Sequence, residues 1–191
     1  MMPTAHEIAR ALYGAYRLAR LDKRGLAFFD ASVGGFWRSF FAAVLVAPFY
    51  GLLLALRYQV EAGAAGPLRH ALIEAVAYVI AWLAYPVIMI GLTRVLDREA
   101  RYLRYIVAYN WAAVLENALY LPVAMLAVSD SVPGDAGNLL GMVALMLILA
   151  YTWFIARAAL DVSALTAAGL VAMDFVLSLI INGIAEARLA A

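Results

Sequence analysis

Residues 71–92, ALIEAVAYVIAWLAYPVIMIGL, decide the class of this protein, because the stretch is 22 residues long and contains one charged side chain, Glu74. A helix of about 20 apolar residues crosses the roughly 30 Å hydrocarbon core of a bilayer. Continuous apolar runs without alternation favour helices over a membrane β-barrel. The sequence therefore predicts an all-α polytopic membrane helix bundle with five transmembrane helices, at residues 39–56, 71–92, 106–128, 139–156 and 164–185.

The composition of the 191-residue chain agrees with this class, with 67% apolar residues, 14% charged residues and a mean hydropathy of +0.89. The net charge of +1 does not indicate a nucleic-acid partner. Cysteine is absent, which excludes disulfides, thiolate metal sites and cysteine nucleophiles. The chain has no GxSxG, GxxxxGK or HExxH motif, and its two histidines, His6 and His70, are isolated. We therefore expect no cofactor, no metal and no enzymatic activity.

Positive charges are distributed unevenly around the predicted spans, and this asymmetry predicts the orientation. Six basic residues precede the first span, four lie between the second and third, and one follows the fourth, which places 11 of the 14 on one side. These are Arg10, Arg17, Arg20, Lys23, Arg24, Arg38, Arg94, Arg98, Arg101, Arg104 and Arg157. An excess of lysine and arginine marks the cytoplasmic side. The amino terminus is expected in the cytoplasm and the carboxyl terminus outside, in a bacterial-type inner membrane.

Residues 1–38 form a charged cytoplasmic tail ahead of the membrane domain at 39–191. Thr4 and Glu7 have the spacing of a capping box, and from about residue 5 to 21 apolar and basic side chains fall on different helical faces. We interpret this segment as an amphipathic helix in the membrane interface; the alternative is a soluble helix docked on the loops of the bundle. Anionic lipid headgroups are the expected partners of Arg10, Arg17, Arg20, Arg24, Arg94, Arg98, Arg101 and Arg104.

Small residues recur at helical spacing in two of the predicted spans. In the first span they occupy every fourth position, at Ser39, Ala43, Ala47, Gly51 and Ala55. Gly137 and Gly141 form a GxxxG motif at the outer end of the fourth. Such stripes let two helix backbones approach closely. We expect them to serve packing within the chain, although a protein partner or a second copy of the chain is also compatible with them.

Polar residues inside the third and fifth spans are the candidate functional residues. Glu116 and Asn117 lie near the middle of the third span, with Asn110 two turns earlier, and the fifth span has Asp174, Ser178 and Asn182 at four-residue steps. An ionised carboxylate at this depth costs about 2.5 to 3.5 kcal/mol, and the spans offer no basic partner. Both stripes should face the bundle interior, with the acids neutral and hydrogen-bonded to amide or hydroxyl groups.

Two roles are open for Glu116 and Asp174. In the first, they hold helices together through hydrogen bonds worth roughly 0.6 to 2 kcal/mol each. In the second, they relay protons or cations in a small transporter or channel. We favour the first role, because the sequence offers no polar path between the two membrane faces. Glu74 lies near the outer surface, on one helical face with Tyr78 and Tyr85.

The layout resembles the Yip family of small membrane proteins, including its bacterial members. A cytoplasmic tail precedes five closely spaced spans, and three short segments are similar to bacterial members: Ala27-Phe28-Phe29-Asp30, Phe36-Trp37-Arg38 and Tyr109-Asn110-Trp111. The Asp-Leu-Tyr-Gly-Pro element of eukaryotic members, which are associated with small GTPases and vesicle traffic, is absent. The resemblance therefore implies no specific partner or site. It implies a non-enzymatic membrane protein that acts through lipids or protein partners.

The predicted topology can be tested with a reporter. Alkaline phosphatase, which is active only outside the cytoplasm, is fused to the carboxyl terminus and assayed in intact cells. Five spans and a cytoplasmic amino terminus predict an active fusion. An inactive fusion that is expressed at full length would place the carboxyl terminus in the cytoplasm and contradict the predicted topology.

Overall fold

The computed structural model describes residues 2–60, 66–129 and 133–190, and among these residues it contains helices and no strand. Five segments are long and apolar enough to cross a membrane: Val33–Gln59, Pro67–Val95, Glu99–Val128, Gly134–Leu160 and Ala164–Ala190. The prediction of an all-helical chain with five helices long and apolar enough to span a membrane is therefore confirmed. The elements in chain order are α1 (Ala5–Ala19), η1 (Lys23–Phe28), α2 (Val33–Ser39), α3 (Phe41–Val60), α4 (Pro67–Val95), η2 (Glu99–Arg101), α5 (Tyr102–Val128), α6 (Gly134–Leu160) and α7 (Ala164–Ala190).

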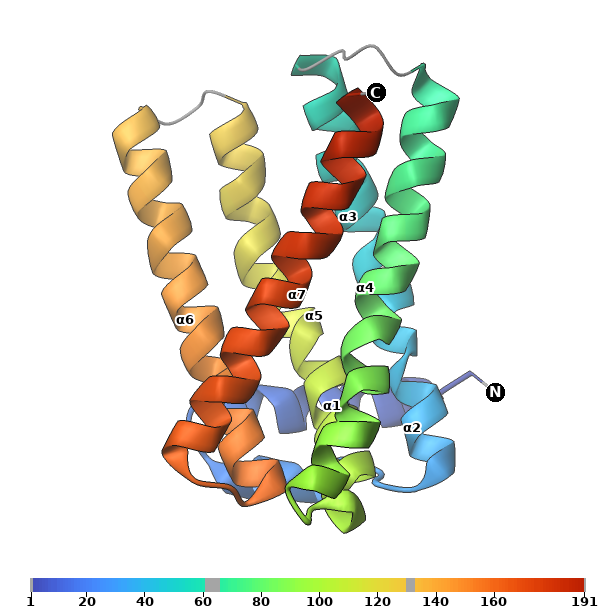
Figure 1. The fold of residues 1–191 in the computed structure, drawn as a ribbon, viewed down its shortest axis with the longest axis vertical. Helices are drawn as coiled ribbons and strands as arrows, with labels where there is room; N and C mark the ends of the chain where they lie inside the picture. Colours follow the sequence, from blue (N-terminus) through green and yellow to red (C-terminus); the bar gives the residue numbers. More distant parts are fainter. Residues whose placement is uncertain (1, 61–65, 130–132, 191) are drawn as a thin grey trace.

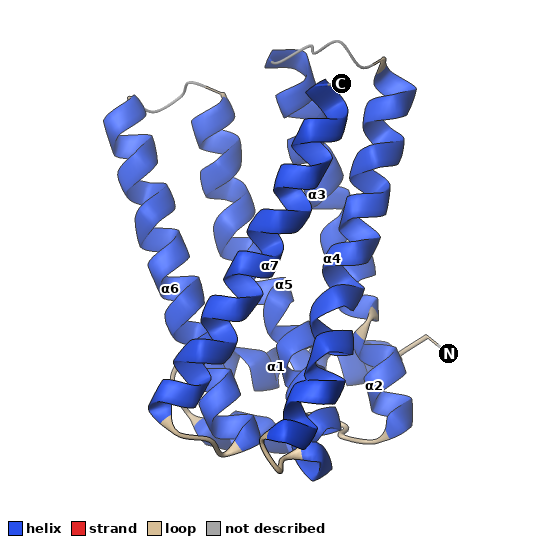
Figure 2. Cartoon of the chain, in the orientation of Figure 1, coloured by secondary structure: helices blue, strands red, loops and turns tan. Residues whose placement is uncertain are grey.

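The long helices α3 to α7 stand side by side, and α1, η1 and α2 gather at one end of the bundle (Figure 1). Apart from short connections, the described chain is helical throughout (Figure 2). Helix α5 packs against α1, α2, α3 and α6, while α7 packs against α4 and α6. Helix α5 is therefore the central element, and its polar side chains meet partners from several directions.

Local sequence determines how the short amino-terminal helices begin. The Thr4 backbone N–H donates to Glu7 Oε2 at 2.7 Å and the Glu7 backbone N–H donates to Thr4 Oγ1 at 3.3 Å, which completes the predicted capping box. The bond from the Thr4 backbone, with help from the Thr4 hydroxyl, lowers the pKa of Glu7. Helix α2 is capped by Ser32, whose Oγ accepts from the Gly35 backbone N–H at 3.0 Å. The long helix α4 also has a sequence signal at its start, because it begins at Pro67, and proline is a favourable first helical residue.

The chain folds back after α1, so that η1 packs on α1. Two glycines, Gly14 of α1 and Gly25 of η1, make this close contact. A Cβ atom at Gly14 would lie 2.9 Å from the Gly25 carbonyl oxygen, and one at Gly25 would lie 2.5 Å from the Gly14 carbonyl oxygen. Real Cβ atoms do not approach backbone so closely. Both positions therefore need glycine, and the resulting contact holds η1 against α1.

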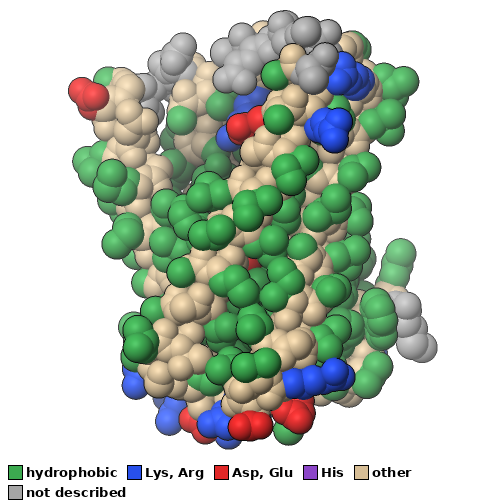
Figure 3. Space-filling view, viewed as in Figure 1, with side chains coloured by type: hydrophobic (Ala, Val, Ile, Leu, Met, Phe, Trp, Pro, Cys, Tyr) green, Lys and Arg blue, Asp and Glu red, His purple; other side chains and the backbone are tan. Residues whose placement is uncertain are grey.

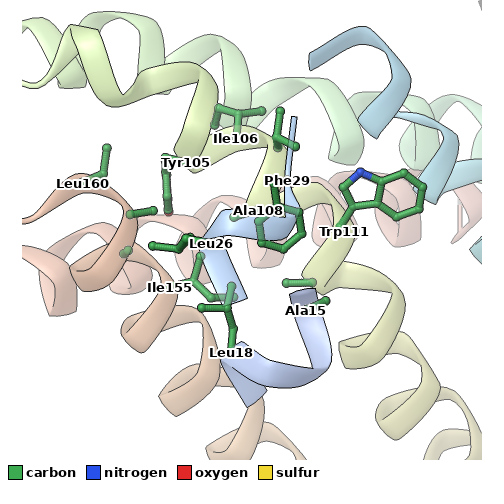
Figure 4. Packing of buried hydrophobic residues seen from close by; sticks show 14 of the residues in the cluster. Ala15, Leu18, Leu26, Phe29, Tyr105, Ile106, Ala108, Trp111, Ile155 and Leu160 are labelled. Atoms are coloured by element: carbon green, nitrogen blue, oxygen red, sulfur yellow. The ribbon is translucent and has the colours of Figure 1, made fainter. Parts of the chain in front are cut away.

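The largest buried apolar cluster lies at the α1 end of the bundle (Figure 4). Ala15 and Leu18 of α1 are fully buried and lie beside Trp111 of α5 and Ile155 of α6. Tyr151 Oη also donates to the Ala15 carbonyl at 2.8 Å. The apolar face of α1 thus packs on the helices α5 and α6 rather than on the loops of the bundle.

The predicted stripe of small residues begins at Ser39, the last residue of α2, and continues along α3; only Ser39 is fully buried. Ala43 is half-buried, and Ala47 and Gly51 are exposed. Helix α3 instead contacts α5 through a small cluster of branched and small side chains, Val46, Leu53, Leu121 and Ala124. This contact turns the rest of the stripe toward α4.

The GxxxG motif of α6 makes no close contact within the described chain. A Cβ atom at Gly137 or Gly141 would meet no heavy atom within 4 Å beyond its own surroundings in the helix, and Gly51 is equally open. The structure therefore does not use these glycines for close packing between its own helices.

The different surroundings of the helical glycines give a stability test. Gly14→Ala should lower the free energy of unfolding by about 1 to 3 kcal/mol, because the new methyl group overpacks the contact with η1. Gly141→Ala, the matched control, should raise it by up to about 1 kcal/mol, because alanine favours a helix and the space is open. Denaturant titration of purified protein in micelles measures both. Equal effects of the two substitutions would contradict the α1–η1 contact.

Candidate functional site

The two intramembrane acids each bind a hydroxyl group from another helix. Thr152 Oγ1 on α6 donates to Glu116 Oε1 on α5 at 2.9 Å, and Thr152 is 4% exposed. Tyr109 Oη on α5 donates to Asp174 on α7, at 3.1 Å from Oδ1 and 2.9 Å from Oδ2. Both acids are partly buried. These two bonds link α5 to α6 and to α7.

Two further tyrosines extend this site toward α4. Tyr109 stacks on Tyr85 of α4 with ring centroids 4.7 Å apart, and Tyr85 Oη and Tyr105 Oη form a buried hydrogen bond of 2.6 Å. A buried tyrosine hydroxyl needs such a partner. We call the set of these side chains from four helices the polar cluster: Tyr85, Tyr105, Tyr109, Glu116, Thr152 and Asp174.

Asn110 makes a separate link between α5 and α2. Its Nδ2 donates to Ser39 Oγ at 2.8 Å, and both side chains are fully buried. Ser39 Oγ in turn donates to the Phe36 carbonyl at 2.7 Å. The Asn110 Oδ1 atom has no hydrogen-bond partner among the described residues. This contact connects the central helix with the segment where the chain enters the first span.

The structure brings together only some of the predicted intramembrane residues. Asn117 Nδ2 donates to the Ala113 carbonyl at 2.8 Å and Ser178 Oγ donates to the Phe175 carbonyl at 2.8 Å, so both side chains bond their own helices. Asn182 is exposed. The partners of the acids are thus hydroxyl groups rather than these amides.

Sequence reasoning missed Thr152, Tyr85 and Tyr105 as members of the polar cluster. One signal was present, because Tyr105, Tyr109 and Glu116 follow one another at spacings of four and seven residues and so share a face of α5. Thr152 gave no such signal. A single threonine in an apolar span can bond its own helix backbone, and Thr152 Oγ1 also lies 2.9 Å from the Ile148 carbonyl oxygen.

Neither acid lines any of four cavities found in the described chain. The four cavities have volumes of about 430, 340, 540 and 260 Å³. Asn117 lines the smallest. Within the described residues, no group of three or more histidine, aspartate or glutamate side chains could hold a metal ion. The polar cluster can hold helices together through its hydrogen bonds.

Several of the predicted headgroup-binding arginines are already paired with protein groups. Asp22 binds both Arg17 and Arg24, and Arg101 pairs with Asp161 at 3.0 Å. Hydrogen bonds from Arg24 and Arg17 hold the pKa of Asp22 well below its ordinary value of 3.8. These Asp22 contacts therefore stabilise the fold above about pH 4 and are lost as the pH falls through that lowered pKa.

Other arginines at the α1 end of the bundle form no ion pair, and some of them donate to backbone carbonyl oxygens instead. Arg98 donates to the carbonyl oxygens of Asp97 at 3.0 Å and Asp161 at 3.4 Å, and Arg10 donates to the Ala27 carbonyl at 3.2 Å. In the described part of the chain, no ion pair involves Arg20, Arg94 or Arg104. Figure 3 shows basic and acidic side chains together at the lower end of the bundle, below a broad apolar surface.

Comparison of this chain with protein-family models, with curated proteins and with solved structures finds no match. Function is therefore inferred from the geometry of the chain itself.

The bond between Thr152 and Glu116 can be tested against a matched threonine. Thr152→Val keeps the side-chain shape but removes the donor to Glu116, whereas Thr93→Val removes a hydroxyl that donates only to backbone of its own helix. Thr152→Val should lower the free energy of unfolding by about 0.6 to 1.7 kcal/mol more than Thr93→Val does. Denaturant titration of both variants in the same micelles measures the difference. No difference would mean that the bond does not stabilise the bundle.

Proposed function

We propose that this protein is a non-enzymatic organising component of a bacterial-type inner membrane, which acts through anionic lipids and protein partners at the end of the bundle that carries α1. The observation that supports this proposal most directly is the asymmetry between the two ends. Helix α1, η1 and the basic segments around α2, η2 and the last turn of α6 gather at one end. Positive charge of this kind faces the cytoplasm, where the membrane surface is negative.

The unpaired arginines are the groups most available to lipid phosphates. Arg20 is the residue directly after α1, Arg94 lies in the last turn of α4, and Arg104 lies in the first turn of α5. A guanidinium group without a protein counter-ion gains a charge-assisted hydrogen bond when it binds a phosphate. An arginine that is already paired with an aspartate gains less. Arg10 and Arg98 also lack an acidic partner, but their guanidinium groups already donate to backbone carbonyl oxygens. We therefore narrow the predicted set of headgroup-binding arginines to Arg20, Arg94 and Arg104.

Helix α1 is suited to a position in the membrane interface. Its buried face is taken up by contacts with α5 and α6, and its other face carries Tyr13 and Tyr16, each 50% exposed. Arg20 lies over the Tyr16 ring at 5.8 Å. Aromatic rings next to basic groups are favoured at headgroup depth. The helix can thus be docked on the bundle and lie in the interface at once.

A proton- or cation-coupled transporter that uses Glu116 and Asp174 is the second candidate. In its favour, the two acids and three tyrosines lie together in the polar cluster. Against it, no described cavity of the four reaches either acid, and each acid is held by a direct bond to a neighbouring helix. These bonds favour a structural role. The Yip-like layout agrees with an organising component as well, but it does not distinguish that role from transport.

The lipid contacts are tested by removing the three unpaired arginines. The protein is released from nanodiscs that contain phosphatidylglycerol and phosphatidylcholine, and native mass spectrometry measures which lipid stays bound. The triple variant Arg20→Gln, Arg94→Gln, Arg104→Gln should reduce the preference for phosphatidylglycerol at least tenfold, since each basic group near the surface contributes up to about 1 kcal/mol.

The matched control removes an ion pair from the same end without changing the net charge. The double variant Arg101→Gln, Asp161→Asn should keep the lipid preference of the wild type, because the Arg101 charge is already paired. A wild-type preference in the triple variant would contradict the proposal.

A further inference from the structure

A cavity of about 430 Å³ lies between α3 and α4, toward the end of the bundle away from α1. Its volume falls in the range of small-molecule sites, which is about 300 to 1,000 Å³. The walls include small residues from both helices, among them Ala47 and Gly51 of α3 and Ala71 and Ala75 of α4. Because α3 packs on α5 through other side chains, these small residues leave open space between α3 and α4.

Aromatic contacts bound this cavity along its length. Toward the α1 end, Tyr78 Oη donates to the Ala43 carbonyl at 2.7 Å, and the Tyr78 and Tyr50 rings stack with centroids 5.1 Å apart. Toward the other end, the Tyr58 and His70 rings meet edge to face with centroids 5.1 Å apart. Tyr50, Tyr58 and Tyr78 all line the cavity. Three aromatic rings therefore surround a space that is otherwise lined by small apolar groups.

Two polar groups on α4 also line the cavity, one helical turn apart. Glu74 Oε2 accepts from Tyr50 Oη at 3.1 Å, and within the described chain no basic side chain forms an ion pair with Glu74. The Nε2 atom of His70 is buried and has no hydrogen-bond partner among the described residues. A buried polar atom without a partner requires an explanation, and a bound ligand is one. The neutral histidine ring and the carboxylate can both accept hydrogen bonds from the same ligand group.

We propose that this cavity binds a lipophilic amine in its protonated form. The Glu74 carboxylate is the counter-ion of the ammonium group, and His70 Nε2 accepts one of its N–H donors. Tyr50, Tyr58 and Tyr78 line the same cavity, and aromatic rings attract a cation that lies over their faces. The apolar body of the amine fills the space between the small residues of α3 and α4.

Other occupants fit the cavity less well. An anion would be repelled by Glu74, and an acyl chain would leave both Glu74 and His70 Nε2 without a ligand partner. A quaternary ammonium compound would meet the carboxylate and the rings, but it has no N–H group to donate to His70. This proposal does not depend on the headgroup contacts at the α1 end, so either can fail without the other.

The probe for the proposed site is 4-phenylbutylamine, which carries a protonated amine at pH 7, as lysine does. Its neutral analogue, 4-phenylbutanol, has the same apolar body. Ligand-observed NMR with protein in nanodiscs, after subtraction of empty nanodiscs, gives the dissociation constant of each. The amine should bind at least tenfold more tightly than the alcohol. Equal binding of the two compounds to the wild-type protein, which is the result expected if an acyl chain occupies the cavity, would overturn the proposal without any variant.

Variants then assign the preference to the cavity. Glu74→Gln should reduce the affinity for the amine at least tenfold and leave that for the alcohol unchanged. Asp135→Asn, which removes an exposed carboxylate near the start of α6, should change neither. An equal loss in both variants, or no loss in Glu74→Gln, would contradict the role of Glu74.

The contribution of His70 is tested with the trimethylammonium derivative of the same amine. The wild-type protein should bind this compound severalfold more weakly than the amine, and His70→Phe should remove the difference while keeping the aromatic contact with Tyr58. Equal binding of both compounds to the wild type would exclude His70 as an acceptor.

Discussion

The hydrocarbon core of a membrane offers no water to polar groups, and this constraint explains the contacts of the central helix α5. Tyr109, Glu116 and Asn110 of α5 each bond a side chain from a different helix: Asp174 of α7, Thr152 of α6 and Ser39 of α2. A polar group left unpaired at this depth is expensive, so each bond favours one arrangement of helices over its alternatives. The apolar contacts fill the space that these bonds define.

The two ends of the bundle differ in how they are built. At the α1 end, the amino-terminal segment covers the helices and contributes Ala15, Leu18 and Phe29 to the main core. Toward the other end, cavities lie between α3 and α4 and between α4 and α7. The two proposals, headgroup contacts at the α1 end and a bound amine between α3 and α4, rest on this difference.

The sequence predicted those features that depend on local properties. Five spans follow from length and apolarity, and the capping box of Thr4 and Glu7 follows from a three-residue spacing. Which side chains meet between helices depends on the rotation of each helix about its axis, which a single sequence does not provide. The stripe of small residues in α3 therefore faces a cavity, although we expected close packing. The inward position of Glu116 and Asp174 could be expected, but their hydroxyl partners could not.

A double-mutant cycle between Tyr109 and Asp174 tests most directly whether the acids hold the bundle together. The free energy of unfolding is measured for Tyr109→Phe, Asp174→Asn, the double variant and the wild type in the same micelles. A stabilising bond predicts a coupling energy of about 0.6 to 1.7 kcal/mol. Strictly additive effects would contradict the structural role of Asp174.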